Sequence, residues 1–169
     1  VLAIARLQAG GAPDPKVFDA ADLAADMAEL YEPAAEDKSL DFGSEIERGL
    51  LVEGNRAFLA QALANLIDNA IKYTPAGGAV KLRARRRSSG EIEYSVTDTG
   101  PGMEPAEAAR LFEAFTQGDE SATRTAEGLG LGLTAAHGLA ALMGGKIEIV
   151  TAPCAGSTFR VVLPLKAVA

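Results

Sequence analysis

Residues 65–72 read NLIDNAIK and place two carboxamides, Asn65 and Asn69, one helical turn apart. The apolar residues of this segment gather on one side of the expected helix, and the asparagines and Lys72 lie on the other, with Gln61 extending the row. A solvated polar face is one interpretation, although asparagine is a poor helix former. Carboxamide oxygens also suit a hard cation such as Mg²⁺, and the lysine suits a phosphate.

Residues 98–103 read DTGPGM and follow a segment of alternating character that predicts a strand. Asp98, at the end of that strand, can accept a hydrogen bond from an exocyclic amine, which is one way to recognise adenine. Gly100 and Gly102 allow the backbone to approach a flat ligand closely. Taken alone, the motif fits a tight turn equally well.

Residues 127–132 read EGLGLG and precede a helix expected over about 131–143. The unpaired N–H groups of a helix N-terminus attract phosphate oxygens, and Gly128, Gly130 and Gly132 let those oxygens come close. The spacing matches neither a P-loop nor a GxGxxG turn after a strand. A hinge beside a mobile lid over residues 116–127 is compatible with this interpretation. His137 lies more than a turn further on and is expected to have no part in the chemistry.

The remaining elements must position these three motifs. A helix end at the N-terminus stops at two glycines, and Asp19 and Asn55 are expected to cap helices over 20–37 and 56–73, with Pro33 bending or shortening the first. The other expected elements are strands over 39–46 and 49–54, a hairpin over 79–97, a short acidic helix over 104–115 and a second hairpin over 146–165. Three hairpin-like joints favour a mixed, mostly antiparallel sheet with helices on one face, an α+β fold.

Composition excludes several classes of protein. The 169 residues are 48% hydrophobic and fit one globular domain, while the net charge of −7 argues against nucleic acid as a partner. The basic run Arg83–Arg87 is expected to be a charged strand or hairpin arm. One cysteine, Cys154, permits no intramolecular disulfide and favours a reducing, cytoplasmic compartment. No apolar run reaches the roughly 18–20 residues that cross a bilayer. The start without methionine suggests a piece of a longer protein, whose membrane attachment is left open.

The order of the motifs carries more information than any one of them. NLIDNAIKYTP, DTGPGM, the phenylalanine-containing LFEAF, EGLGLGL and GSTF follow one another in the order seen in the ATP-binding catalytic domain of bacterial sensor histidine kinases, which this chain resembles over about residues 14–166. That family belongs to a superfamily with gyrase and the Hsp90 chaperones. The resemblance implies an α/β sandwich of the Bergerat type, with helices on one face and a lid over ATP.

The resemblance also implies roles for individual residues. Asn69, with Asn65 beside it, is expected to hold Mg²⁺, Lys72 to contact phosphate and Asp98 to bind the adenine amine. Asn65, Asn69 and Lys72 form the expected catalytic set. The further residues expected to contact the nucleotide are Tyr73, Gly100, Gly102, Met103, Gly128, Leu129, Gly130, Leu131, Gly132 and, near the base, Thr158.

The implied reaction is transfer of the ATP γ-phosphate to a histidine on a separate dimerisation domain. Residues 1–12 resemble the end of that domain's helix and a linker, and 13–169 the catalytic domain. The expected partners are that dimerisation domain and the receiver domain of a response regulator, in a homodimeric parent with a cytoplasmic catalytic domain; the fragment alone is expected to be monomeric. Many family members carry an arginine where Gln117 stands here, a place that Arg124 could fill.

Two alternatives remain from the sequence. A gyrase-like or Hsp90-like ATPase is expected to carry a glutamate general base near the start of the asparagine helix, where Gln61 and Asn65 stand here. A nucleotide-sensing or degenerate kinase module would bind ATP and partners without catalysis.

Overall fold

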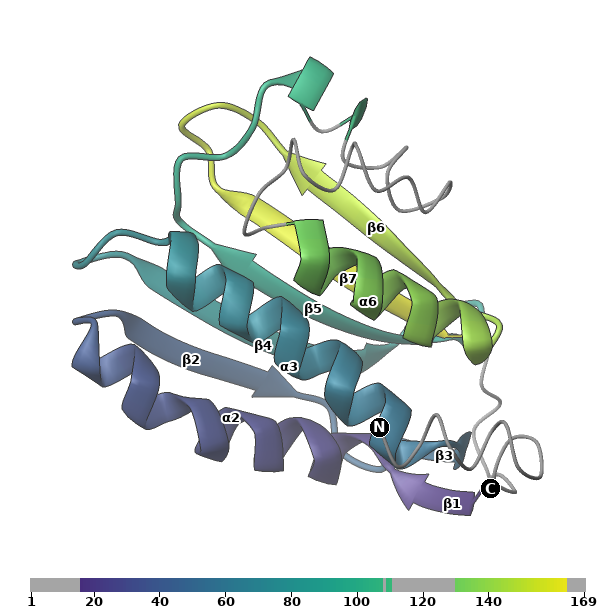
Figure 1. Ribbon diagram of the computed structural model, residues 1–169. Coiled ribbons are helices and arrows are strands. Elements are labelled where there is room, and N and C mark those ends of the chain that lie inside the picture. The colour runs from purple at the N-terminus through teal and green to yellow at the C-terminus, as the bar shows by residue number, and fades with distance from the viewer. Residues whose placement is uncertain (1–15, 108, 111–129, 164–169) are drawn as a thin grey trace.

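The computed structural model describes residues 16–107, 109–110 and 130–163 (Figure 1). The predicted helix end and linker over 1–12 and the predicted lid, with Gln117, Arg124, Gly128 and Leu129, lie outside the described residues. The helices and strands are β1 (Lys16–Asp19), α2 (Ala20–Asp37), β2 (Asp41–Ile46), β3 (Leu51–Gly54), α3 (Arg56–Tyr73), β4 (Ala79–Arg86), β5 (Ile92–Asp98), α6 (Gly130–Leu142), β6 (Lys146–Thr151) and β7 (Ser157–Leu163). None of the described helices is long and apolar enough to cross a bilayer.

The sheet is mixed and mostly antiparallel, as predicted. Its five strands lie in the order β2-β4-β5-β7-β6, only the β2–β4 pair is parallel, and α2, α3 and α6 cover one face (Figure 1). Two predicted hairpins, β4–β5 and β6–β7, are confirmed. The joint between β2 and β3 is not a hairpin. After β2 the chain continues alongside β4, where Glu47 N donates to Ala84 O. β3 instead pairs with β1 in a separate two-stranded ribbon.

Local signals in the sequence set the ends of the helices. The Asp19 side chain accepts from Ala21 N and caps α2, and Asn55 accepts from Phe58 N and caps α3. Pro33 does not shorten α2, which continues to Asp37. Pro33 lies on the exposed side of the helix, where water can replace the hydrogen bond that proline cannot donate.

The core lies between the sheet and the helices. Leu63, Leu66 and Ile67 of α3 are fully buried, and Tyr94 of β5 is buried with its hydroxyl donating to Ala20 O. In Figure 1, α6 lies alongside α3 and runs in the opposite direction. The last turn of α3 and the first turn of α6 therefore lie at the same end of the molecule.

Candidate functional site

A cavity of about 100 Å³ opens where the last turn of α3 meets the end of β5 and the start of β7. Five of the residues predicted to form the site line it, together with four others. The lining residues are Asn69, Ala70, Tyr73, Asp98, Pro101, Gly102, Met103, Ser157 and Phe159. Side chains from distant parts of the sequence therefore meet at one place.

Asp98 lines this cavity and is 9% exposed. Its Oδ1 accepts a hydrogen bond from Gly100 N at 2.8 Å. Burial raises the pKa of Asp98 above its ordinary value, although the backbone N–H groups of Gly100 and Ser157 act in the opposite direction. A ligand that donates a hydrogen bond to this carboxylate would offset part of the cost of its burial.

The glycines around Asp98 are required by the packing of two loops. Gly102 has φ 70°, and a Cβ there would overlap Ala152 O. Gly156 has φ 74°, and a Cβ there would overlap Asp98 O. Loop 99–103 thus lies directly on turn 152–156, and the role of Gly156 was not evident from its place in the GSTF motif.

The structure corrects the predicted position of Asn69. Its side chain is not on the solvent side of α3; it is 7% exposed, at the flank of the core face, where it lines the cavity. Asn69 Nδ2 is buried without a hydrogen-bond partner among the described residues, which ordinarily costs about 1–3 kcal/mol. Asn65 is half-buried, accepts from Gln61 Nε2 at 3.2 Å and is not among the residues that line the cavity.

The last turn of α3 is held from outside by a residue that the sequence analysis did not single out. Lys38, which follows α2, donates from Nζ to the carbonyl oxygens of Ile71 at 2.7 Å and Lys72 at 2.6 Å. A cation at this position also interacts favourably with the helix dipole. The Lys72 side chain is exposed and its Nζ lies 5.4 Å from the centroid of the Tyr73 ring at the edge of the cavity.

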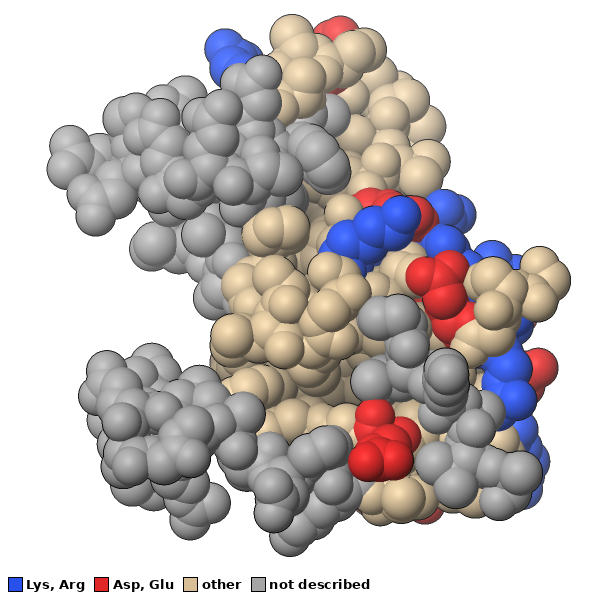
Figure 2. Space-filling model, turned by 90° about the vertical axis from the view of Figure 1, so that its right-hand side faces the viewer, with Lys and Arg blue, Asp and Glu red and all other residues tan. Residues whose placement is uncertain are grey.

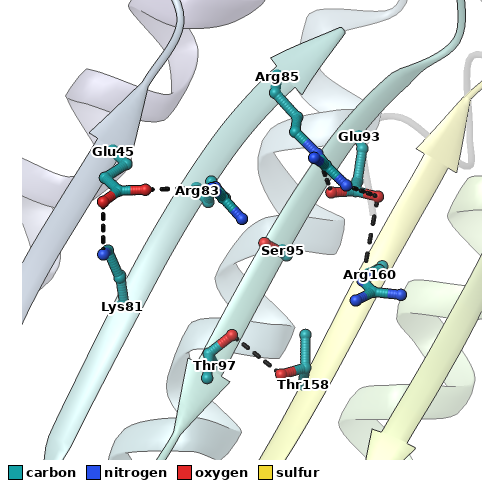
Figure 3. Close-up of a pocket in the computed structure, with 9 residues that line it drawn as sticks. All are labelled: Glu45, Lys81, Arg83, Arg85, Glu93, Ser95, Thr97, Thr158 and Arg160. Carbon is teal, nitrogen blue, oxygen red and sulfur yellow. Dashed lines mark hydrogen bonds and ion pairs between the residues drawn. The ribbon is translucent and has the colours of Figure 1, made fainter. Parts of the chain in front are cut away.

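Thr158 is on the opposite face of the sheet from the cavity, contrary to its predicted place near the base. Its Oγ1 lies 3.0 Å from Thr97 Oγ1 on the face that the helices leave open (Figure 3). Successive strand residues point to opposite faces, so the neighbouring Ser157 lines the cavity instead.

The second glycine motif begins a helix, as predicted. α6 starts at Gly130, followed by Leu131 and Gly132, one residue earlier than expected. Its N-terminal N–H groups are the ones that the sequence assigned to phosphate. His137 lies about two turns into α6 and is half-buried, away from this end.

The open face of the sheet carries a network of ion pairs around Glu93 (Figure 3). The predicted charged strand is confirmed as β4, and Figure 2 shows Lys and Arg side chains along one side of the molecule, interleaved with acidic ones. Glu93 is 1% exposed, and its carboxylate accepts from Arg85 Nε and Arg87 Nε, each at 2.8 Å. Burial alone would raise the pKa of Glu93, but the two arginines outweigh it and lower this pKa.

Comparison with known proteins places the chain. Residues 54–167 match the family described as "Histidine kinase-, DNA gyrase B-, and HSP90-like ATPase". The chain is 35% identical over 165 residues to the sensor-like histidine kinase SenX3 of Mycobacterium tuberculosis, covering 97% of this chain and 40% of SenX3. It is 37% identical over 153 residues to the sensor protein GacS of Pseudomonas syringae, covering 88% of this chain and 17% of GacS.

Solved structures agree with this placement. Full-length ShkA in complex with AMPPNP superposes with a TM-score of 0.79 at 34% identity, covering 99% of this chain and 35% of ShkA. The catalytic domain of the histidine kinase ThkA superposes with a TM-score of 0.76 at 23% identity, covering 92% of this chain and all of that domain (100%).

The fold and the cavity define an ATPase-type α+β domain with helices on one face of a mixed sheet. The chain belongs to the histidine kinase-, DNA gyrase B- and HSP90-like ATPase family, as a catalytic domain of the histidine kinase type. It spans less than half the length of the curated relatives described above.

Proposed function

We propose that this chain is the ATP-binding catalytic domain of a two-component sensor histidine kinase, and that it transfers the γ-phosphate of ATP to a histidine on a separate dimerisation domain. The observation that carries the proposal is the meeting of Asn69, Asp98, Gly102 and Met103 around one cavity. The complex of the related ShkA with AMPPNP supports it. We also propose that residues 13–169 form this domain and 1–12 the end of the dimerisation-domain helix and a linker, with a response regulator as the parent's further partner.

The cavity supplies an adenine-binding end. Asp98 accepts a hydrogen bond from the exocyclic amine, a group that guanine lacks at that position of the ring. Met103 and Phe159 line the walls and offer apolar contact to the base, and Tyr73 stands at the edge. Specificity then comes from one buried acceptor held between apolar walls.

The polar atoms at the other end fit Mg²⁺ and phosphate. Mg²⁺ keeps several waters and is usually held by one or two protein oxygens together with substrate phosphates. Asn69 lines the cavity and would supply one carboxamide oxygen, so an ion shared between Asn69 and the nucleotide phosphates matches this preference. When bound, Mg²⁺ neutralises phosphate charge; Lys72 and the N-terminus of α6 add to this.

Catalysis by such a site consists mainly of positioning and charge neutralisation. Phosphoryl transfer needs little covalent help from the protein, because the transition state has charge spread over its equatorial oxygens. This chain binds and orients the nucleotide. The accepting histidine and any acid that orients it come from the dimerisation domain.

The arrangement of the asparagine helix favours transfer over gyrase-like hydrolysis. Hydrolysis requires a general base to activate water. The positions available for it hold Gln61 and Asn65, whose amides hydrogen-bond to each other at 3.2 Å and cannot accept a proton at neutral pH.

Two measurements test the proposal. Calorimetry with ATP, with and without Mg²⁺, should show binding that Mg²⁺ strengthens. Incubation with γ-labelled ATP and the parent's own dimerisation domain should label that domain on histidine. Binding without any labelling of a matched parent protein would favour the nucleotide-sensing module instead, and absence of binding would overturn both.

Asn69→Ala is expected to weaken Mg-ATP binding about tenfold, equivalent to ~1.4 kcal/mol, because it removes the proposed oxygen ligand. In the presence of EDTA the same substitution should change ATP affinity much less. Calorimetry under both conditions measures the difference, with Gln61→Ala, an exposed carboxamide on the same helix, as the control. An equal loss with and without Mg²⁺ contradicts the metal role.

A further inference from the structure

The hydroxyl of Thr151, at the end of β6, joins three segments around the cavity. Thr151 Oγ1 accepts from Met103 N at 3.0 Å, donates to Gly156 O at 3.1 Å and lies 2.8 Å from Ser157 Oγ. One donor and two acceptor positions are all that a hydroxyl has, so this oxygen is fully used. It connects loop 99–103, turn 152–156 and the first residue of β7.

Backbone contacts join the same two segments nearby. Cys154 N donates to Pro101 O at 2.7 Å, and the positions of Gly102 and Gly156 leave no room for a side chain between the segments. Thr151 adds side-chain hydrogen bonds to these backbone contacts between loop 99–103 and turn 152–156. Its partners Met103 and Ser157 both line the cavity that Asp98 also lines, and the Ser157 backbone N–H bonds to the Asp98 carboxylate.

We propose that Thr151 is a positioning residue for base selectivity: it fixes Met103 and Ser157 relative to Asp98 and so holds adenine in register with the carboxylate. This inference rests on the proposed function. Asp98 can favour an amine over a carbonyl on the base only while the base is held at hydrogen-bonding distance. A displacement of about 1 Å is enough to forfeit an oriented interaction, so loss of the hydroxyl should lower discrimination more than it lowers general nucleotide affinity.

The test separates this role from a purely structural one. Thr151→Val keeps the shape and removes the hydroxyl; Thr151→Ser keeps the hydroxyl. We expect Thr151→Val to weaken ATP binding about tenfold and GTP binding hardly at all, so that the ratio of the two affinities falls by about the same factor. Thr151→Ser should restore the ratio to within about twofold of the wild-type value. Titration calorimetry with each nucleotide gives the ratio.

Thr97→Val is the matched control. It removes a hydroxyl hydrogen bond of similar length from the same sheet, but on the open face, where its partner is Thr158. Because Thr97 is exposed, the substitution should change the melting temperature little and leave the ATP-to-GTP ratio unchanged. If Thr151→Val does not fold, Thr151→Ala, which brings in no extra methyl group, replaces it in the same measurement.

The possible outcomes separate a failure of the proposed function from a failure of the role of Thr151. A wild-type protein that binds neither nucleotide, or does not prefer ATP, overturns the proposed function and this inference with it. A selective wild-type protein whose ratio is unchanged in Thr151→Val, even if that variant melts earlier, overturns the role of Thr151 alone. A reduced ratio in Thr151→Val that Thr151→Ser does not restore also overturns it, because the hydroxyl would then not be responsible.

Discussion

Replacing Asp98 with asparagine is expected to lower the affinity for ATP by roughly ten- to a hundredfold, while the fold remains at least as stable. The affinity should fall because a hydrogen bond to a charged acceptor is typically worth about 1.5–3 kcal/mol. Asparagine Oδ1 can still accept from Gly100 N, and the NH₂ group then replaces the second oxygen, so that the backbone N–H of Ser157 must share the one acceptor that is left. The stability should hold because the substitution removes a buried charge, the one whose burial raises the pKa of Asp98.

Calorimetry with ATP and denaturant unfolding without nucleotide measure the two effects separately. Asp41→Asn, which neutralises an exposed carboxylate on the edge strand β2, is the control. Unchanged ATP affinity in Asp98→Asn would refute the adenine role, and a large loss of stability would show that the carboxylate has a structural role instead.

The role proposed for Asp98 also predicts how stability and ATP affinity depend on pH. The folded-state pKa of Asp98 lies above the ordinary aspartate value of about 3.9, so the ligand-free fold loses stability as pH rises from that value through the raised pKa. Binding of adenine by the ionised carboxylate changes in the opposite direction and weakens as pH falls through the same range. ATP itself also titrates, but Asp98→Asn shares that contribution, so the difference between the two titration curves isolates Asp98.

Glu93→Ala is expected to lower the free energy of unfolding by about 3 kcal/mol, since breaking a buried ion pair leaves its partners uncompensated. We expect the lower end of the usual range because the Arg85 and Arg87 side chains reach solvent, at 46% and 23% exposure. Urea unfolding measures the change. Glu45→Ala removes an exposed acid from the same face, paired with Lys81 and Arg83, and should change stability little.

Unfolding at acid pH provides a second measure of how much Glu93 contributes to stability. Its pKa is lowered in the folded state, so its contribution to stability is complete above the ordinary glutamate pKa and is lost as pH falls through the lowered value. The gap in stability between wild type and Glu93→Ala should therefore narrow in acid. A gap that is small at neutral pH, or that stays constant in acid, would contradict the ion-pair explanation.

What the sequence predicted well rests on signals that are local in the chain. The caps at Asp19 and Asn55 and the two hairpins depend on residues a few positions apart, and the structure has all of them. That Asn69 and Asp98 meet at one cavity was predicted from the order of the motifs and the family resemblance that it carries. No local rule of sequence brings these two residues together.

What the sequence could not predict depends on neighbours distant in the chain. Asn69 is buried beside a cavity that residues of loop 99–103 and β7 also line, and the periodicity of a helix does not report such distant neighbours. The face on which Thr158 lies depends on strand register, where a shift of one residue reverses every side chain. Lys38 bonds to carbonyls 33 and 34 residues away, and no motif marks it.

The opposed directions of α3 and α6 bring two unlike electrical poles to the same end of the molecule. The carbonyl end of α3 carries partial negative charge and the amide end of α6 partial positive charge, each about half an elementary charge. Neighbouring poles of opposite sign produce a steep local field instead of a uniform attraction for either sign. Such a field stabilises a bound species that is itself a contact pair of cation and polyanion. It stabilises a bare anion or a bare cation much less.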